Sequence, residues 1–91
     1  MGLIRERRMK LLARHGHLQY ACDDTAPAKR ELEIGDSVYL NCEGLLFAVR
    51  LLEHHHGKCK GVVSGHYNQE LFPGREIEFE EENIYVVNKA H

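Results

Sequence analysis

The sequence predicts a mainly β fold, a small, bent antiparallel barrel of five or six strands with a short N-terminal helix or arm. Apolar and polar residues alternate in 36–42 and in 76–80, which is the two-residue period of a half-buried strand. Short β-branched or aromatic runs elsewhere are separated by Gly, Pro and Asp. Ninety-one residues can bury one modest core. We therefore expect one domain over residues 17–91, preceded by the arm or short helix over 1–16.

Composition narrows the class of protein. The chain is 43% hydrophobic and 29% charged, which is typical of a globular domain, and its net charge of -2 implies no overall attraction to nucleic acid or acidic membranes. Its three widely spaced cysteines indicate a reducing compartment and argue against a disulfide scaffold. With no apolar segment of secretory or membrane-spanning length, the expected location is cytoplasmic, with no membrane partner.

The N-terminal segment is basic, whereas residues 76–82 carry five glutamates. Residues 2–14 fit a short helix that ends at Gly16. The charge asymmetry favours an arm that docks on the acidic end of its own or a neighbouring subunit. In the alternative, the arm binds nucleic acid. Its phosphate-contacting side chains would then be Arg5, Arg7, Arg8, Lys10 and Arg14.

Several shorter runs supply the expected strands and loops. A strand over 17–22 is followed by a polar loop that contains Pro27, and a second strand covers 36–42. The β-branched run 60–67 and the final run 84–87 also predict strands. A Pro/Gly turn joins the run 60–67 to the alternating residues 76–80.

Residues 44–57 fit two conformations. Seven apolar residues and Gly57 suit a helix that ends in three histidines. A tight turn at Glu43 and Gly44 followed by a partner strand suits the pattern better, because Phe47 and Val49 favour a pleated surface. In a strand, one face carries Phe47, Val49 and Leu51, and the other carries Leu46, Ala48 and Leu52, so both faces need cover.

Two segments resemble known small barrels. The stretch 18–40 has an apolar strand, a polar loop, a turn with Glu31, Leu32, Gly35 and Asp36, and a second strand. The stretch 81–87 is similar to a one-turn helix and a closing strand. Over residues 18–88 the chain thus resembles the SH3-like barrel group, which implies the architecture. The chain lacks the tryptophans of that group's polyproline groove, so the resemblance does not imply that ligand.

The segment "EHHHGKC", residues 53–59, predicts a hairpin tip and also contains possible metal ligands. His56 and Cys59 have the spacing of a zinc half-site, and His54 joins them if the segment is extended, since alternate side chains share a face. The remaining ligands would come from Cys22, Cys42, His66 or the pair His15 and His17. The interpretation of a solvated hairpin tip is preferred, with no cofactor expected and zinc kept as an alternative.

We expect no enzyme activity, because no combination of Cys, His and carboxylate stands out from the many that the sequence allows. The predicted role is a non-catalytic interaction module that binds protein and associates with itself as a homodimer or higher oligomer. Nucleic-acid binding and metal binding are the alternatives. The predicted contact patch comprises Tyr67, Leu71, Phe72 and Arg75, which lie in an apolar loop.

Overall fold

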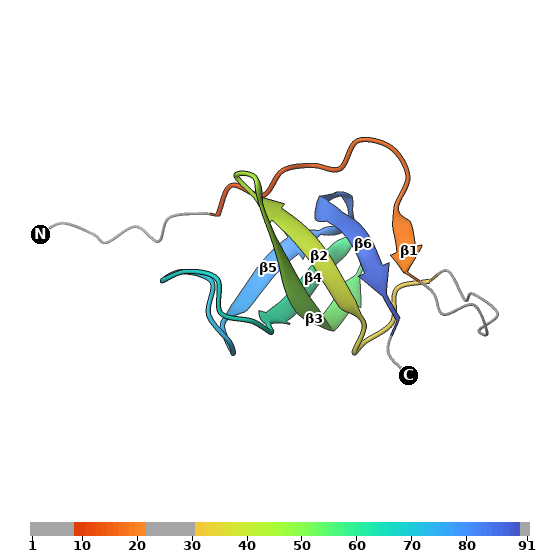
Figure 1. Cartoon of the computed structure of the whole chain (residues 1–91). Helices are drawn as coiled ribbons and strands as arrows, with labels where there is room; N and C mark the ends of the chain where they lie inside the picture. Colours follow the sequence, from red (N-terminus) through yellow and green to blue (C-terminus); the bar gives the residue numbers. More distant parts are fainter. Residues whose placement is uncertain (1–8, 22–30, 90–91) are drawn as a thin grey trace, which may run out of the picture.

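The computed structural model of the chain describes residues 9–21 and 31–89, and in these residues the fold is mainly β (Figure 1). No helix in this part of the chain is long and apolar enough to cross a membrane. The elements in chain order are β1 (Gln19–Ala21), β2 (Ser37–Cys42), β3 (Leu45–His55), β4 (Lys58–Val63), β5 (Glu76–Glu80), the 3-10 helix η1 (Glu81–Asn83) and β6 (Ile84–Asn88).

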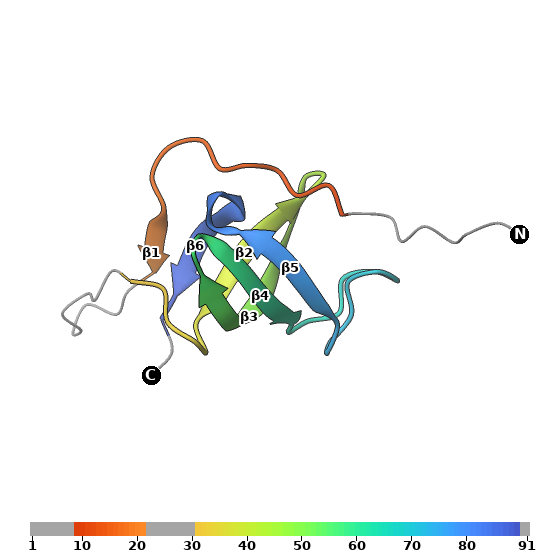
Figure 2. The same cartoon turned by 180° about the vertical axis from the view of Figure 1, so that it is seen from behind.

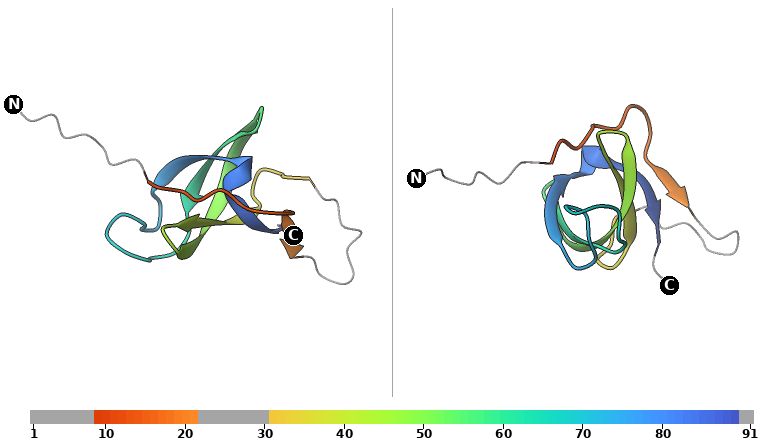
Figure 3. Two further views of the ribbon diagram at one scale, coloured as in Figure 1. Left: turned by 90° about the horizontal axis from the view of Figure 1, so that it is seen from above. Right: turned by 60° about the vertical axis from the view of Figure 1, so that its left-hand side comes forward.

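The strands form one strongly curled sheet in the order β1-β6-β2-β3-β4-β5 (Figure 3). Every neighbouring pair is antiparallel except β1 and β6, which are parallel. The prediction of an antiparallel barrel is therefore corrected in two respects. The sheet is mixed, because the long connection before β2 places β1 beside β6, and it is not closed, because β1 and β5 form its two edges.

The strand β3 forms the centre of the fold and confirms the extended interpretation of residues 44–57. Phe47, Val49 and Leu51 are fully buried, whereas Leu46 and Leu52 of the other face are exposed. A β-bulge between Leu51 and Glu53 shifts the register against β4. The bulge bends β3, so that its first half pairs with β2 and its second half with β4.

Gly61 on β4 is required by the close approach of β3. A Cβ atom at this position would overlap the Cγ1 atom of Val49 and lie 2.7 Å from the carbonyl oxygen of Arg50. This close approach lets β3 and β4 cross tightly at the bend. The missing side chain at Gly61 therefore lets the two backbones come this close beside the bulge in β3.

Two tight hairpin turns join β2 to β3 and β3 to β4. Glu43 and Gly44 have φ of 52° and 96°, and His56 and Gly57 have φ of 52° and 79°. Two consecutive left-handed residues give the turns that match the twist of antiparallel strands. The predicted turn at 43–44 and the predicted hairpin tip in "EHHHGKC" are both confirmed.

The chain before β1 is extended rather than helical over residues 9–14 (Figure 1). Leu11 forms an antiparallel bridge with Cys42, because β2 extends beyond the end of β6 and leaves an unpaired edge there. Arg14 donates through its backbone N–H to the carbonyl oxygen of Glu82 at 2.7 Å. The predicted helix is therefore wrong for residues 9–14, and its residues 2–8 lie outside the described part.

Asp36 ends the turn that leads into β2, and its carboxylate is buried with partners. Its Oδ2 atom accepts from the backbone N–H of Glu33 at 2.8 Å and from Nζ of Lys89 at 2.6 Å. Its carbonyl accepts from the N–H of Leu51 at 2.8 Å. The turn is thus tied both to the centre of β3 and to the end of β6.

Candidate functional site

The β2–β3 hairpin, the β4–β5 loop and the start of the segment before β1 lie at one end of the molecule (Figures 1 and 3). These three segments carry most of the large exposed apolar side chains of the described residues. Large exposed apolar groups at one end of a small domain are typical of interaction surfaces. We call five residues the apolar end. They are Leu12 (45% exposed), Leu45 (38%), Leu46 (53%), Tyr67 (37%) and Phe72 (42%).

Backbone pairing places Leu12 and Leu46 on the same outer surface. The N–H of Leu12 donates to the carbonyl oxygen of Asn41 at 2.9 Å, and Asn41 is the register partner of Leu46. Since Phe47 points into the core, its neighbour Leu46 must point outward. The two leucines therefore flank the end of β2 from opposite sides.

The β4–β5 loop, residues 64–75, is anchored to the core by Leu71, which is only 1% exposed. The N–H of Tyr67 donates to the carbonyl oxygen of Leu71 at 2.9 Å. The hydroxyl of Tyr67 accepts from the N–H of Ala48 at 3.0 Å, and its ring meets Phe47 edge-on at a centroid distance of 6.1 Å. These contacts bind the loop to β3 and leave Phe72 in solvent.

The structure separates the four residues of the predicted contact patch by their exposure. Tyr67 and Phe72 reach the surface, but Leu71 belongs to the core. Arg75 supports the loop, because its Nη1 atom donates to the carbonyl oxygen of Glu70 at 2.5 Å. The sequence analysis did not include Leu12, Leu45 or Leu46 in the contact patch. Of these three, only Leu46 had a sequence signal for exposure, namely its place on the second apolar face of β3.

The thiol of Cys42, which lies near the apolar end, is not activated as a nucleophile. Burial raises the pKa of Cys42, and the carboxylates of Glu43 and Glu70 raise it further. A thiol with a raised pKa stays protonated at neutral pH, and the protonated form is a poor nucleophile. Cys42 packs instead against the core.

At the β3–β4 hairpin, His54 and Cys59 are register partners across the two strands. The Nε2 atom of His54 is buried and has no hydrogen-bond partner in the described structure. It lies 3.4 Å from the Oε2 atom of Glu81. His56 lies in the turn, and its ring meets the ring of His55 edge-on at a centroid distance of 4.1 Å. The structure therefore brings His54 and Cys59 together and places His56 elsewhere.

The described residues do not bring together the zinc ligands of the alternative hypothesis, and Cys22, one of its candidate ligands, lies outside the described part of the chain. Within residues 9–21 and 31–89, no three His, Cys, Asp or Glu side chains are grouped closely enough to hold a metal ion. Burial, followed by the carboxylate of Glu81, raises the pKa of Cys59 to about 11. Zinc binds the thiolate, so a raised pKa works against Cys59 as a ligand. Cys59 is a core residue.

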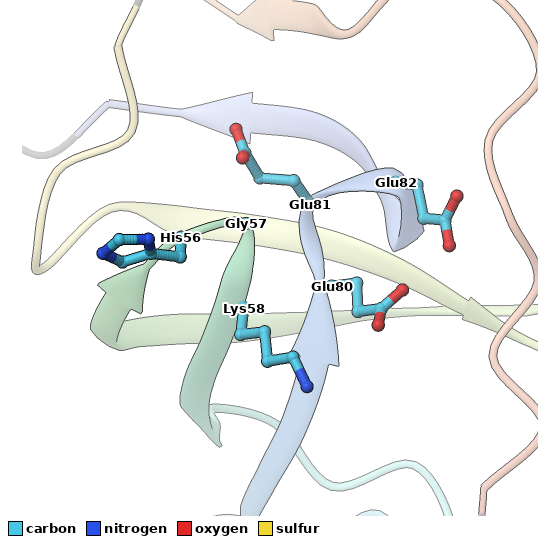
Figure 4. A pocket seen from close by; sticks show the side chains of 6 residues that line it. All are labelled: His56, Gly57, Lys58, Glu80, Glu81 and Glu82. Carbon is cyan, nitrogen blue, oxygen red and sulfur yellow. The ribbon is translucent and has the colours of Figure 1, made fainter.

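An open acidic hollow of about 350 Å³ lies beside the hairpin, where β5 meets the 3-10 helix (Figure 4). The carboxylates of Glu80 and Glu82 point to the same side, whereas Glu81 points away from them (Figure 4). A hydrogen bond with Glu80 raises the pKa of Glu82, and repulsion from the Glu80 charge adds to this effect. The hollow is lined by His56, Gly57, Lys58, Glu80, Glu81 and Glu82.

Of the residues that the alternative hypothesis assigns to phosphate contacts, the structure describes only Lys10 and Arg14. Arg14 supports the fold, since its guanidinium donates to the carbonyl oxygens of Gly16 at 3.1 Å and Ile84 at 2.6 Å. Lys10 is exposed. Arg5, Arg7 and Arg8 lie outside the described residues.

Comparison of the chain with protein-family models, with curated proteins and with solved structures found no match.

Proposed function

We propose that the protein is a non-catalytic interaction module whose apolar end contacts protein, first of all a second copy of the chain. The observation that carries the proposal is the position of its exposed large apolar side chains. Five of the seven found in the described residues lie at one end, and the other two are Ile34 and Leu52. Burying such groups against a partner removes apolar area from water, which is the main driving force of association.

Other features support a binding role over a catalytic one. The described thiols of Cys42 and Cys59 have raised pKa values, so neither is an activated nucleophile at neutral pH. We also propose that the domain has an SH3-like architecture and that the protein is cytoplasmic. The one-turn helix Glu81–Asn83 followed directly by β6 supports the architecture, because this pair was expected from the resemblance.

Sedimentation equilibrium over a range of protein concentrations tests the proposal. The wild-type mass should rise above 10.5 kDa with concentration. Leu46→Ser and Phe72→Ser should each weaken association roughly tenfold, because each removes about 1 kcal/mol or more of apolar burial. Leu52→Ser is the matched control, since Leu52 is an exposed leucine of β3 outside the apolar end, and it should leave association unchanged.

Circular dichroism and thermal unfolding of each variant separate loss of association from loss of fold. A wild-type mass of 10.5 kDa at every concentration would exclude self-association. Equal weakening by Leu52→Ser and Leu46→Ser would show that the apolar end is not the contact surface.

A further inference from the structure

The strand β5 is an edge of the sheet, with β4 on one side only (Figure 2). The flanking hydrogen bonds show which of its residues face β4. Val63 donates to the carbonyl oxygen of Arg75 at 2.8 Å, and Glu81 donates to that of Gly57 at 2.9 Å. Antiparallel pairs alternate between hydrogen-bonded and non-hydrogen-bonded, so Ile77 and Phe79 also bond to β4. The backbone groups of Glu76, Glu78 and Glu80 therefore point to the open edge.

Most of these edge groups have no partner within the described residues. The N–H of Glu80 is already bound by the Oδ1 atom of Asn83 at 2.8 Å. Among residues 9–21 and 31–89, no group forms a hydrogen bond with the outward N–H and C=O groups of Glu76 and Glu78. These groups repeat every second residue, which is the pattern that an added strand pairs with.

The edge is also acidic. The side chains of Glu76, Glu78 and Glu80 are exposed, whereas Ile77 and Phe79 point into the core. Lys60 forms an ion pair with Glu76 at 3.1 Å, but within the described residues no ion pair is found for Glu78 or Glu80. The acidic hollow continues the negative charge beyond the end of β5.

We propose that β5 accepts an added strand from a partner protein, and that this strand alternates Lys or Arg with apolar residues. Backbone pairing with Glu76 and Glu78 supplies the register. Because side chains alternate across a strand, the basic residues then lie beside the glutamates and the apolar residues lie on the core side with Ile77 and Phe79. A second copy of β5 is a poor occupant, since its glutamates would face the same row of glutamates.

This inference concerns residues other than the apolar end and does not depend on self-association. The probe is a short peptide of alternating lysine and valine with blocked ends. Its binding to the full chain is measured by calorimetry, and amide protection is measured by hydrogen exchange with NMR. We expect salt-sensitive binding, with slower exchange of the Glu76 and Glu78 amides when the peptide is present.

Two variants and one modified peptide separate strand addition from simple charge attraction. Glu78→Lys should weaken binding roughly tenfold, because it reverses a charge beside the added strand. Glu53→Lys makes the same charge change at an exposed position of β3 and should leave affinity nearly unchanged. A peptide that is N-methylated on the residues that pair with β5 keeps its charge but loses its backbone donors, so it should not bind.

Three results would overturn the proposal. They are absence of peptide binding, equal affinity of the methylated and unmodified peptides, and equal effects of Glu78→Lys and Glu53→Lys. Protection of the Glu76 and Glu78 amides without peptide would assign the edge to another occupant. If that protection rises with protein concentration, the occupant is a second copy; if it disappears on deletion of residues 1–8, it is the N-terminal segment of the chain.

Discussion

The Nζ atom of Lys89 donates to the Oδ2 atom of Asp36 at 2.6 Å and joins the end of β6 to the turn before β2. Lys89 also pairs with Oε1 of Glu33 at 3.0 Å and donates to the carbonyl oxygen of Glu31. Asp36 is 1% exposed, so its charge depends on these partners rather than on water.

Replacement of Lys89 by Met should therefore destabilise the fold, since it removes a cation that pairs with the buried carboxylate of Asp36. We expect the free energy of unfolding to fall by about 3 kcal/mol, measured by urea denaturation at neutral pH. Lys58→Met is the control, because Lys58 is exposed and forms no ion pair within the described residues. A change for Lys89→Met no larger than that of the control would contradict this role of the ion pair.

The same ion pair predicts a pH dependence. Desolvation by burial lowers the pKa of Lys89, but the hydrogen bonds and charges of Asp36 and Glu33 outweigh it and raise the pKa above 10.5. A raised pKa stabilises the fold fully below the unfolded pKa, and this stabilisation is lost as the pH rises through the folded pKa. The stability difference between wild type and Lys89→Met should thus shrink above pH 10.5. A constant difference up to and beyond that pH would contradict the linkage.

Gly61→Ala tests the close approach of β3 and β4. The added methyl group overlaps Val49, so we expect a loss of about 2 kcal/mol in the free energy of unfolding. Lys58→Ala places the same residue at an exposed position of β4 and should change stability by less than about 0.5 kcal/mol. Thermal unfolding measures both, and equal midpoints would show that the strands do not approach so closely at the bend.

Arg14→Ala tests whether this residue supports the fold. Losing its bonds to the carbonyl oxygens of Gly16 and Ile84 should lower the free energy of unfolding by about 1–2 kcal/mol. Lys10→Ala removes the same charge from an exposed residue and should have almost no effect. Equal, small effects of the two changes would instead suit an arm that is free for phosphate.

The raised pKa of Cys59 predicts slow modification. At pH 8 the thiol of Cys59 should react with iodoacetamide far more slowly in the folded chain than in urea, because burial and the charge of Glu81 hold its pKa at about 11. Peptide mapping by mass spectrometry follows each cysteine separately. Similar rates for Cys59 in the folded and unfolded chains would show that the thiol is accessible and ionised.

Local patterns predicted much of the fold. The alternation of Ile77 and Phe79 with glutamates predicted β5, and "EHHHGKC" predicted a hairpin tip, because strand period and turn residues are properties of neighbouring positions. The residues of the apolar end were harder to predict from the sequence. Leu71 and Phe72 are adjacent and equally apolar in the sequence, yet the first enters the core and the second stays in solvent. That difference depends on how the loop meets β3.

The sequence by itself determined a mainly β chain, the faces of β3 and the glutamate row of β5, since side-chain direction follows directly from strand periodicity. Only the tertiary structure decided that β1 lies parallel to β6, that Arg14 supports the 3-10 helix, and that no other described strand pairs with the outer edge of β5. These outcomes depend on contacts between residues far apart in the chain, and no local pattern contains them.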